Sequence, residues 1–376
     1  MRLIYPYNEI LPKKSAHDVY IVRNCTSLAT EGCTVELVCG AGSLSPDCLA
    51  KHYNIHPVGR FSWKTLPIIR KNLGIPLTWD KLFFWGTQRY ISKSSPDWVA
   101  LSVFKQGAYH LKRRHPGTKY LYEVHELAWY PGRDVYEPKL RKRLALEREL
   151  LSRADAVTVT TDALHDILRG WPYELTVPIA IIPLAVDFTP LPPPPPFTGE
   201  LQLMYVGQMY QGQGVNLLLQ ALTQTEGIRL TLVGGKLNEL NELRQLAQTL
   251  GIESRVNFTG FLPPTELPEI VANSHVLIAP FSATGRMAYV AHTKLLEYAA
   301  WQRPIVAPDL PVVREHFSRE KGWVPFIADN VDSLAAALRS LSEDELRQNL
   351  TTACLQQGVL TWKERSSRLL EFLYAL

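Results

Sequence analysis

Short apolar runs alternate with helix-like stretches along nearly the whole chain, and they do so in two separate blocks. The runs are rich in Val, Ile and Leu, and each has the length of a strand buried on both faces. Strands that alternate with helices indicate βαβ units, and hence parallel sheets covered by helices. A proline-rich segment, residues 183–199, separates the blocks, because consecutive prolines lack backbone donors and favour an extended chain. The sequence therefore predicts two Rossmann-like, doubly wound α/β domains that face each other across a cleft.

The expected elements follow the apolar runs. In the first block we expect strands near 1–5, 35–39, 98–104, 119–124, 156–160 and 179–182, with helices filling the gaps between them, notably at 17–31 and 137–152. In the second block we expect strands at 201–207, 228–235, 255–261, 275–280 and 304–308, with helices at 215–222, 240–250, 264–274 and 293–302. The predicted boundaries are 1–182 and 200–360 for the domains, 183–199 for the linker, and 361–376 for an amphipathic C-terminal helix that crosses back to the first domain.

A chain of 376 residues is long enough for two domains that each bury a core. None of its apolar runs approaches the ~20 residues needed to span a bilayer. The first apolar stretch is interrupted by Asn8, Glu9 and Pro12, where a signal peptide would be continuous. We therefore expect a cytoplasmic protein.

The cysteines also suit a reducing compartment. None belongs to a Cys-x-x-Cys pair, and most lie in apolar stretches, which is typical of reduced, buried thiols. Cys48, His52 and His56 have four-residue spacings, but no fourth ligand is nearby, so no metal site is predicted.

Charge is distributed unevenly between the two halves. Residues 1–180 carry 25 Lys and Arg against 17 Asp and Glu, a net +8, whereas the remainder carries 15 against 19, a net −4. Clusters at 112–114 and 139–143 could attract an anionic lipid surface or an acidic acceptor, so peripheral membrane contact is one interpretation. A solvated helix face with Glu147 and Glu149 as partners is the other. Nucleic acid is disfavoured, because no recognised binding module accompanies the charge.

Glycines stand at the ends of two successive strands in the second block. Gly207 ends the first strand, before a helix that opens at Gly214, and Gly234 with Gly235 ends the second. Ligands of open parallel sheets bind at the carboxyl ends of strands, where glycines and helix N-termini admit a phosphate. Glycines at such turns are also common for geometric reasons alone. Their occurrence in successive units favours a phosphate site.

A third candidate point follows the fourth strand of this block. Thr293 is expected to cap the next helix, and Glu297 lies four residues further on, so both can face the strand ends. A hydroxyl and amides suit a phosphate, and a carboxylate suits the hydroxyls of a ribose. The alternative for Glu297 is a solvent-exposed helix glutamate.

The chain resembles the family-4 retaining glycosyltransferases over nearly its whole length. The runs that carry the resemblance are AHDVYIVRNCTSLATEGCTVELVCG, YEVHE, SRADAVTVTTDAL, IIPLAVD, YVGQMYQGQGVNLLLQAL, LVGG, RVNFTGF and TKLLEYAAWQRPIVAPDLPVVRE. The resemblance implies a GT-B fold and transfer of a hexose from a nucleoside-diphosphate sugar to a glycan, lipid or small-molecule acceptor. It also implies retention of configuration, no metal ion and no cofactor. Domain 1–182 would bind the acceptor, and domain 200–360 the donor.

The resemblance also assigns donor-binding residues in the second domain. Glu297 matches the glutamate that binds the ribose. The other positions that it places around the diphosphate, nucleoside and sugar are Gly207, Gln208, Gln213, Gly214, Gly234, Gly235, Phe261, Leu262, Tyr289 and Thr293.

In the first domain, the resemblance places His125 and Glu126 at a strand end near the reaction centre. A lone histidine is more often structural, and the Val-His-Glu context reverses that interpretation. Ser15, Ala16 and His17 match the loop that enters the cleft before the first helix.

Three residues depart from the family pattern. Gln208 and Gln213 stand where an Arg and a Lys usually neutralise the diphosphate, and Tyr289 stands where an acid usually holds the sugar. A variant branch carries a Lys-Leu-x-Glu-Tyr pattern, which residues 294–298 match. Side chains that could supply the missing charge are Lys236, Arg286 and Lys294.

Several questions stay open at this level. Trp129 and Tyr130 could stack on an acceptor sugar or pack a loop. An inverting transferase or a sugar-nucleotide epimerase would share the fold and the diphosphate site. A transferase-like binding protein without catalysis is a further alternative, suggested by the three departures. No Asp-x-Asp motif, the usual metal-binding signature of metal-dependent transferases, occurs in the chain.

Overall fold

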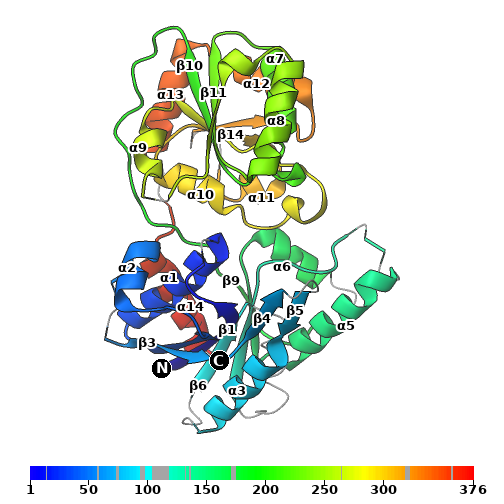
Figure 1. Cartoon of the computed structure of the whole chain (residues 1–376). Helices are drawn as coiled ribbons and strands as arrows, with labels where there is room; N and C mark the ends of the chain where they lie inside the picture. The colour runs from blue at the N-terminus through cyan, green and yellow to red at the C-terminus, as the bar shows by residue number, and fades with distance from the viewer. Residues whose placement is uncertain are drawn as a thin grey trace. The chain divides into compact units, whose positions relative to one another are not determined.

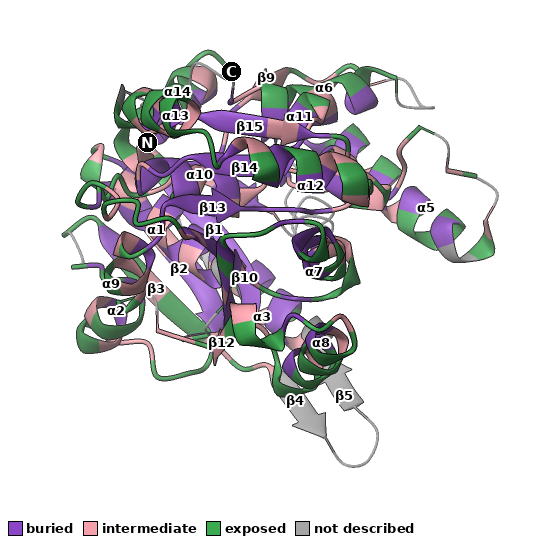
Figure 2. Ribbon diagram, turned by 90° about the horizontal axis from the view of Figure 1, so that it is seen from above, coloured by how far each residue is buried: buried purple, intermediate pink, exposed green. Residues whose placement is uncertain are grey.

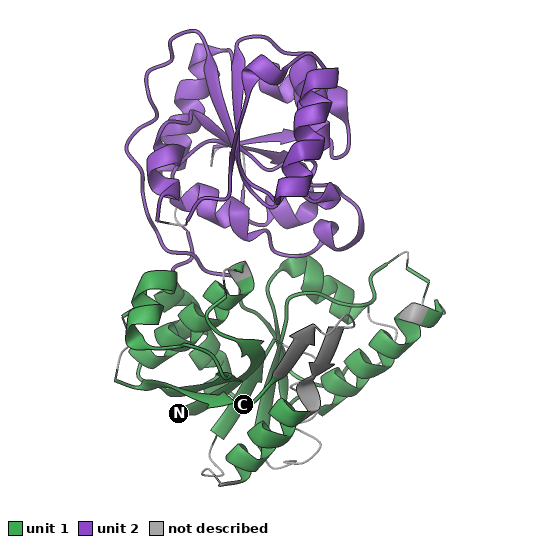
Figure 3. Cartoon of the chain, viewed as in Figure 1, with its two compact units in different colours: residues 1–183, 362–376 green, residues 184–361 purple. Residues whose placement is uncertain are grey.

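The chain divides into two compact units, which Figure 3 colours separately. A computed structural model describes residues 1–13, 15–56, 59–72, 76–93, 98–103, 118–131, 133–134, 137–170, 175–263, 265–317, 322–356 and 359–376. Unit 1 comprises Met1–Pro183 together with Trp362–Leu376, and unit 2 comprises Leu184–Thr361.

Unit 1 is built on a seven-stranded parallel sheet with the order β3-β2-β1-β6-β7-β8-β9 (Figure 1). Its strands are β1 (Arg2–Ile10), β2 (Thr34–Gly40), β3 (Phe61–Leu66), β6 (Trp98–Ser102), β7 (Lys119–Val124), β8 (Ala156–Val159) and β9 (Ile179–Ile181). A separate antiparallel pair is formed by β4 (Ile69–Asn72) and β5 (Pro76–Trp79). The helices are α1 (Ala16–Thr30), α2 (Pro46–Tyr53), α3 (Asp80–Lys93), α5 (Pro138–Arg153), α6 (Asp162–Arg169) and α14 (Trp362–Tyr374).

Unit 2 is built on a six-stranded parallel sheet with the order β12-β11-β10-β13-β14-β15. Its strands are β10 (Leu201–Gly207), β11 (Ile228–Gly234), β12 (Val256–Gly260), β13 (Val276–Ile278), β14 (Ile305–Pro308) and β15 (Trp323–Phe326). The helices are α7 (Val215–Thr223), α8 (Leu237–Thr249), α9 (Leu267–Ala272), α10 (Thr293–Ala300), α11 (Pro311–Arg314), α12 (Val331–Ser340) and α13 (Asp344–Gln356). Short 3-10 turns are η1 (Gln211–Gln213), η2 (Glu253–Arg255) and η3 (Gly285–Ala288).

The predicted fold class is confirmed: both large sheets are parallel, and helices connect successive strands wherever the connecting residues are described. The strands are apolar because both of their faces are covered, and Figure 2 shows them buried between helices with exposed outer faces. Leu3 and Ile4 of β1 and Leu230 and Leu232 of β11 are fully buried examples. Strand order reverses between β1 and β6 in unit 1, and between β10 and β13 in unit 2. Such switch points open a crevice at the carboxyl edge of a sheet.

The C-terminal helix α14 packs within unit 1, far from its neighbours in sequence. Ser27 Oγ on α1 donates to the carbonyl of Trp362 at 2.8 Å and lies 2.7 Å from Ser366 Oγ. Leu369, Leu370 and the guanidinium of Arg365 are buried in the same contact. The polypeptide therefore leaves unit 1 at residue 183 and returns to it with its last helix.

The proline-rich segment packs against the rest of unit 2. Arg303 Nη2 donates to the carbonyl of Pro192 at 2.8 Å, and Leu191 joins an apolar cluster of that unit. His275 Nε2 lies 3.0 Å from the carbonyl of Pro195. These contacts use proline carbonyls, which are the only backbone hydrogen-bonding groups that proline offers.

Several elements were not predicted from the sequence. In the first block these are β3, β4 and β5, and in the second they are β15, α11, α12 and α13. Many are polar and short, so their hydrophobic periodicity is weak. Helices α2, α3 and α6 lie in gaps where helices were expected without stated bounds. Strand β1 also runs to Ile10, beyond the expected end at residue 5. Within the described residues, no helix combines the length and the apolar character needed to cross a membrane.

Candidate functional site

The carboxyl edge of the unit 2 sheet is lined by closely approaching backbone. Gly207 of β10 and Gly234 of β11 are register partners at the last position of their strands. A Cβ at Gly234 would lie 2.3 Å from the carbonyl oxygen of Gly207, and the φ of Gly234 is +106°. Both facts exclude a larger residue there. Gly207 is half-buried, so this edge leaves backbone accessible where a ligand would approach.

The loop that follows β10 is held against the end of β13, across the switch point. Gly214 has a φ of +72°, and a Cβ there would lie 1.7 Å from the carbonyl oxygen of Pro280. Ser282 N donates to the carbonyl of Gly212 at 3.1 Å, which fixes the same approach. Helix α7 begins directly after Gly214, so its N-terminus is positioned by this contact.

The ammonium of Lys294, in the first turn of α10, lies against the glycine edge. Its Nζ donates to Tyr205 Oη at 2.7 Å and to Gln213 Oε1 at 2.5 Å. It also lies 4.1 Å from the centroid of the Tyr205 ring, within cation–π range. A Cβ at Gly207 would lie only 3.0 Å from this Nζ. Tyr205 Oη in turn donates to the carbonyl of Gln208. The structure therefore brings Gly207, Gln208, Gln213 and Lys294 together.

The charge of Lys294 is tuned by its surroundings. Burial lowers the pKa of its ammonium to about 7, and the nearby negative charge of Glu297 acts in the opposite direction. Glu297 itself is exposed, one turn further along α10. An ammonium whose hydrogen-bond partners are an uncharged amide and a phenol retains capacity for an anionic ligand.

Helix α10 is anchored to the strand ends by Tyr298. The Tyr298 hydroxyl accepts from Val206 N at 2.9 Å and lies 3.1 Å from the carbonyl of the same residue. The expected capping by Thr293 is wrong: His292 occupies the N-cap position, with no side-chain cap, and Thr293 is the first helical residue. The chain enters the helix through an extended His292, so the hydroxyl of Thr293 falls one residue too late to cap.

The loop before α10 is packed tightly. His292 stacks on Phe281 with ring centroids 3.6 Å apart, and its Nε2 lies 2.8 Å from the carbonyl of Met287. Burial, with smaller contributions from the charges of Lys294 and Arg286, lowers the pKa of His292 to about 4, although the hydrogen bond with Met287 opposes the shift. Tyr289, which stands where the family pattern has a sugar-binding acid, is buried within this loop.

The remaining predicted donor-binding residues lie around this edge. Gln208 and Arg286 are exposed, and Gly235 has a φ of +78° beside Met209. Lys236 precedes α8 with its side chain exposed, and its backbone N–H donates to Glu239 at 2.9 Å. After β12, Phe261 is exposed and Leu262 is half-buried.

A cavity of about 450 Å³ lies next to this edge in unit 2. It shares Met209 and Tyr210 with the loop after β10, and it is also lined by the carboxylates of Glu239 and Glu242. Two carboxylates disfavour a diphosphate, so the lysine-bearing edge is the better anion site.

In unit 1, His125 directly follows β7 and is held by a buried carboxylate. Its Nε2 lies 2.6 Å from Glu123 Oε1, and Tyr20 Oη donates to the same oxygen. The ring of Tyr20 meets the His125 ring edge-on, with centroids 4.8 Å apart. Glu126, the second residue predicted near the reaction centre, is half-buried beside it.

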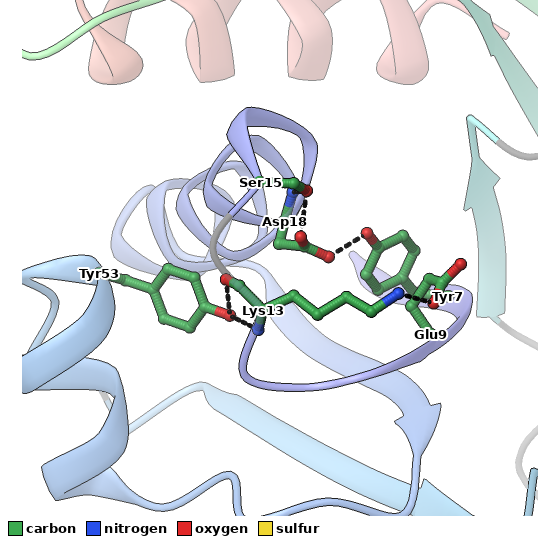
Figure 4. A network of polar contacts seen from close by, with 6 residues as sticks. All are labelled: Tyr7, Glu9, Lys13, Ser15, Asp18 and Tyr53. Atoms are coloured by element: carbon green, nitrogen blue, oxygen red, sulfur yellow. Dashed lines mark hydrogen bonds and ion pairs between the residues drawn. The ribbon is translucent and has the colours of Figure 1, made fainter. Parts of the chain in front are cut away.

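The first turn of α1 reaches the same region, because Ala16 and His17 belong to the helix and not to the loop before it, where they were expected. The ring centroids of His17 and His125 lie 6.0 Å apart. Burial is the main cause that lowers the pKa of His17 to about 4, and the charge of His125 is the second. Ser15 caps α1 by accepting from Asp18 N, and Tyr7 and Ser15 both donate to the Asp18 carboxylate (Figure 4). Ala16 is the first residue of α1. The structure therefore brings His17 and His125 together.

Trp129 and Tyr130 are half-buried on the segment that follows His125 and Glu126. The guanidinium of Arg133 lies 5.6 Å from the Tyr130 ring and donates to the carbonyl of Ala128 at 2.9 Å. The proposed surface role of Glu147 is wrong. Its carboxylate is buried, and both of its oxygens accept from Ala128 N, which satisfies a backbone donor that the loop would otherwise bury unpaired.

The basic clusters of the first half have different outcomes. Residues 112–114 lie outside the described residues, as does the side chain of residue 139. Arg141, Lys142 and Arg143 are exposed on α5, and Glu149 pairs with Arg153 at 2.9 Å.

All five cysteines are free thiols and four are buried, as expected. No cluster of three or more His, Cys, Asp or Glu side chains suited to a metal ion is found in the described part of the chain.

Sequence reasoning missed several residues that the structure places at these sites. Tyr205 was not predicted to be a site residue, although it lies two residues before Gly207 and therefore on the same face of β10. The same two-residue spacing relates Glu123 to His125. Arg365 gave no signal, because a single arginine in an amphipathic helix is normally solvated.

Comparisons with known proteins agree with this architecture. A family model described as Glycosyl transferases group 1 matches residues 200–344, and one described as Glycosyl transferase 4-like domain matches residues 16–185. A D-inositol 3-phosphate glycosyltransferase of Corynebacterium urealyticum is 26% identical over 269 residues, which are 65% of this chain and 61% of that protein. The chain thus matches less than two thirds of that relative's length.

Solved structures resemble the chain over its whole length. Sucrose-phosphate synthase from Thermosynechococcus elongatus superposes with a TM-score of 0.73 at 18% identity, covering 100% of this chain and 99% of that one. Anabaena Alr3699/HepE, solved in complex with UDP-glucose, gives a TM-score of 0.72 at 14% identity and 100% coverage of both chains. At such identities the likeness concerns the fold.

Two doubly wound parallel sheets, with matches of this extent, define a fold of the GT-B glycosyltransferase class. Residues 200–344 thus form a domain of the Glycosyl transferases group 1 family, and residues 16–185 form a Glycosyl transferase 4-like domain.

Proposed function

We propose that the chain transfers a hexose from a nucleoside-diphosphate sugar, bound at the carboxyl edge of the unit 2 sheet, to a glycan, lipid or small-molecule acceptor. The observation that carries this proposal is the ammonium of Lys294, held by Tyr205 and Gln213 directly against Gly207. A fixed cation beside accessible glycine backbone at a topological switch point is suited to a diphosphate. Lys294 thereby compensates for the glutamines at 208 and 213, where cations are usual.

The chemistry requires charge stabilisation at the leaving group. As the bond between sugar and diphosphate lengthens, negative charge grows on the phosphate and the sugar becomes oxocarbenium-like. A positioned ammonium and backbone N–H groups then stabilise the transition state more than the ground state, and one such donor is worth ~3 kcal/mol. The exposed carboxylate of Glu297 is proposed to bind the ribose hydroxyls.

The comparisons support this choice of donor by likeness. Anabaena Alr3699/HepE is a structure in complex with UDP-glucose, and the Corynebacterium relative is named as a glycosyltransferase. We infer that the donor here is also a sugar nucleotide.

We further propose a retaining mechanism that needs no metal ion. The acceptor would attack from the face of the leaving group, and the departing phosphate would accept its proton. Activity is then expected to survive EDTA, because Lys294 and backbone amides supply the positive charge. Complete loss on chelation, restored by Mg²⁺ or Mn²⁺, would refute metal independence.

His125 is proposed to contact the donor sugar as the bond breaks. On this proposal His125→Ala lowers turnover by roughly ten- to a thousandfold, as for the loss of one transition-state hydrogen bond. Nucleotide affinity is expected to stay unchanged, because the diphosphate site lies in the other unit. A stable variant with unaltered turnover would remove His125 from the reaction.

The exposed basic residues of α5 support a proposal of peripheral contact with an anionic membrane. Arg141, Lys142 and Arg143 are exposed on consecutive positions. Triple substitution by Gln is expected to abolish sedimentation with vesicles that contain anionic lipid, whereas neutral vesicles should not bind either protein. Equal sedimentation of both proteins would show that this face is merely solvated.

Product analysis tests the reaction itself. Incubation with the donor and a hexose-bearing acceptor, followed by NMR of the anomeric proton, is expected to give a product with the configuration of the donor. An inverted product indicates the inverting alternative, and conversion of the donor to another sugar nucleotide indicates an epimerase. A donor that binds but is neither transferred nor hydrolysed indicates a binding protein without catalysis.

A further inference from the structure

An arginine from the last helix is buried directly behind His125. Arg365 of α14 is 0% exposed, and its Nη2 lies 3.0 Å from Glu123 Oε1. Its Nη1 donates to Asn24 Oδ1 on α1 at 2.6 Å, and its guanidinium lies 5.2 Å from the Tyr20 ring. A fully buried arginine has few reasons to exist other than pairing with a buried charge.

The partner of this arginine is the carboxylate that holds His125. Glu123 Oε1 accepts from Tyr20, approaches Arg365 and contacts His125 Nε2, whereas Glu123 Oε2 has no hydrogen-bond partner among the described residues. Burial alone would raise the pKa of Glu123, but Arg365 and the hydrogen bond to His125 outweigh it and lower the pKa to about 2. Glu123 is therefore ionised throughout the physiological range.

An ionised carboxylate decides which histidine nitrogen carries hydrogen. Such a group can only accept hydrogen bonds, so the His125 Nε2 that lies 2.6 Å from it must donate. In the neutral ring, the lone pair then belongs to Nδ1. If Glu123 were protonated it could donate instead, and the tautomer of His125 would no longer be fixed. Arginine suits this task because its guanidinium does not lose its proton in proteins.

We propose that Arg365 is a positioning residue of the reaction centre, which through Glu123 fixes His125 in the tautomer protonated at Nε2. The functional part of this inference rests on the proposed role of His125 at the donor sugar. The C-terminal helix is then part of the site as well as of the packing of unit 1. Trp362 of the same helix supports the arrangement, since its ring lies 5.6 Å from that of Tyr20, which packs edge-on against His125.

The direct test is ¹⁵N NMR of the full chain labelled at histidine, with the His125 signal assigned by its absence in His125→Ala. In the neutral ring, the wild type is expected to show protonated Nε2 and unprotonated Nδ1. In Arg365→Met this preference is expected to be lost, and Arg365→Lys should restore it at least in part by returning a positive charge. An unchanged Nε2–H tautomer in a folded Arg365→Met protein would overturn the proposal.

A matched control separates this role from the packing of α14. Ser366→Ala removes the 2.7 Å contact with Ser27 on the same helix but leaves Arg365 and Glu123 in place. It should lower the melting temperature slightly and leave the His125 signals unchanged. If Ser366→Ala disturbs the tautomer as much as Arg365→Met does, the effect comes from helix packing, and the proposal fails.

Removal of one buried charge can prevent folding, so a second variant is needed. The double variant Glu123→Gln/Arg365→Met removes both charges together and leaves none unpaired. It is expected to fold and to lose the fixed tautomer as Arg365→Met does, because the amide of Gln can donate or accept. Retention of the Nε2–H tautomer in the double variant would contradict the proposal.

Turnover separates this inference from the proposed function. Arg365→Met should lower kcat on the order of ten- to a thousandfold, as expected for a histidine in the wrong tautomer, with KM for the donor nearly unchanged. If Arg365→Met loses the Nε2–H tautomer of His125 but keeps its kcat, the positioning role is contradicted. The conclusion that Arg365 fixes the tautomer through Glu123 would still stand. Unaltered kcat in His125→Ala would instead refute the proposed function of His125.

Discussion

Lys294 carries a charge that its own burial opposes. Desolvation lowers the pKa of the ammonium to about 7, so in the free protein the side chain loses its proton near neutral pH. Its pKa in the unfolded chain is higher, so the free protein is destabilised by this group below pH 7, and the penalty fades as the pH rises towards the ordinary pKa of lysine. A bound diphosphate would favour the protonated form. Binding should therefore be coupled to proton uptake.

The pH dependence of donor binding follows from that coupling. Above pH 7 the affinity for a sugar nucleotide is predicted to fall by up to about tenfold per pH unit, because the ammonium must first regain its proton. Calorimetry at pH 8 in buffers of different ionisation enthalpy should detect the proton taken up. Lys294→Met should bind weakly with no such dependence, and Arg339→Met, which removes an exposed cation of the same unit, should behave as the wild type. Proton uptake that persists in Lys294→Met would contradict the assignment.

Glu297 is predicted to bind the ribose hydroxyls. This direct contact can be separated from the influence of Glu297 on the pKa of Lys294. Loss of a charge-assisted hydrogen bond in Glu297→Ala should weaken nucleotide binding by ~1.5–3 kcal/mol. Glu297 also raises the pKa of Lys294, so part of the loss at pH 8 would be indirect. At pH 6, below the pKa of Lys294 in the wild type, the indirect part is smaller than at pH 8. Unchanged calorimetric affinity at pH 6 in a folded variant would remove Glu297 from the ribose site.

Among the elements, the connection from β10 to α7 depends on one close approach. Gly214→Ala would place a methyl group 1.7 Å from the carbonyl oxygen of Pro280, at a φ of +72°. We predict a lower melting temperature together with weaker donor binding, because the loop and α7 must move away from β13. Gly251→Ala is a matched control, since Gly251 has a φ of +68° and nothing within 4 Å of the added carbon. It should cost only backbone strain, ~1 kcal/mol, and leave donor binding unchanged. Equal effects of the two variants would show that the contact with Pro280 is unimportant.

The sequence predicted most of the strands that are buried on both faces, and it missed several elements with weaker patterns. Strands such as β10, β11 and β7 were expected within one residue of their ends, because apolar residues dominate a stretch of strand length. Polar and short elements, such as β3, depend on tertiary contacts that are invisible in a local pattern. Thr293 illustrates the same limit for caps, because a shift of one residue transfers the N-cap to His292.

The candidate site was predictable where it depends on local sequence. Gly207, Gly234 and Gly214 were identified from their places at strand ends, and their backbone angles explain why glycine is needed. Lys294 was one of three candidate cations, and only the packing of α10 singles it out. The pairing of Glu123 with Arg365 joins residues 242 positions apart, which no local pattern could reveal.

In the whole molecule, the two units have different proposed tasks. Unit 2 carries the proposed donor site around Lys294, and unit 1 carries His125 with its supporting Glu123 and Arg365. The return of α14 to unit 1 closes that unit with residues from both ends of the chain. The central claim is that a sugar nucleotide binds unit 2 through Lys294 without a metal ion.

A thermal-shift screen in EDTA tests that claim most directly, with UDP, GDP, ADP and TDP sugars added to wild type and to Lys294→Met. A donor at 100 times its dissociation constant should stabilise the wild type by ~2.7 kcal/mol. We predict that one nucleotide class raises the melting temperature of the wild type, and that the same concentration has little effect on the variant. A wild type that responds to none of these donors in EDTA, or a variant that responds equally, would contradict the account.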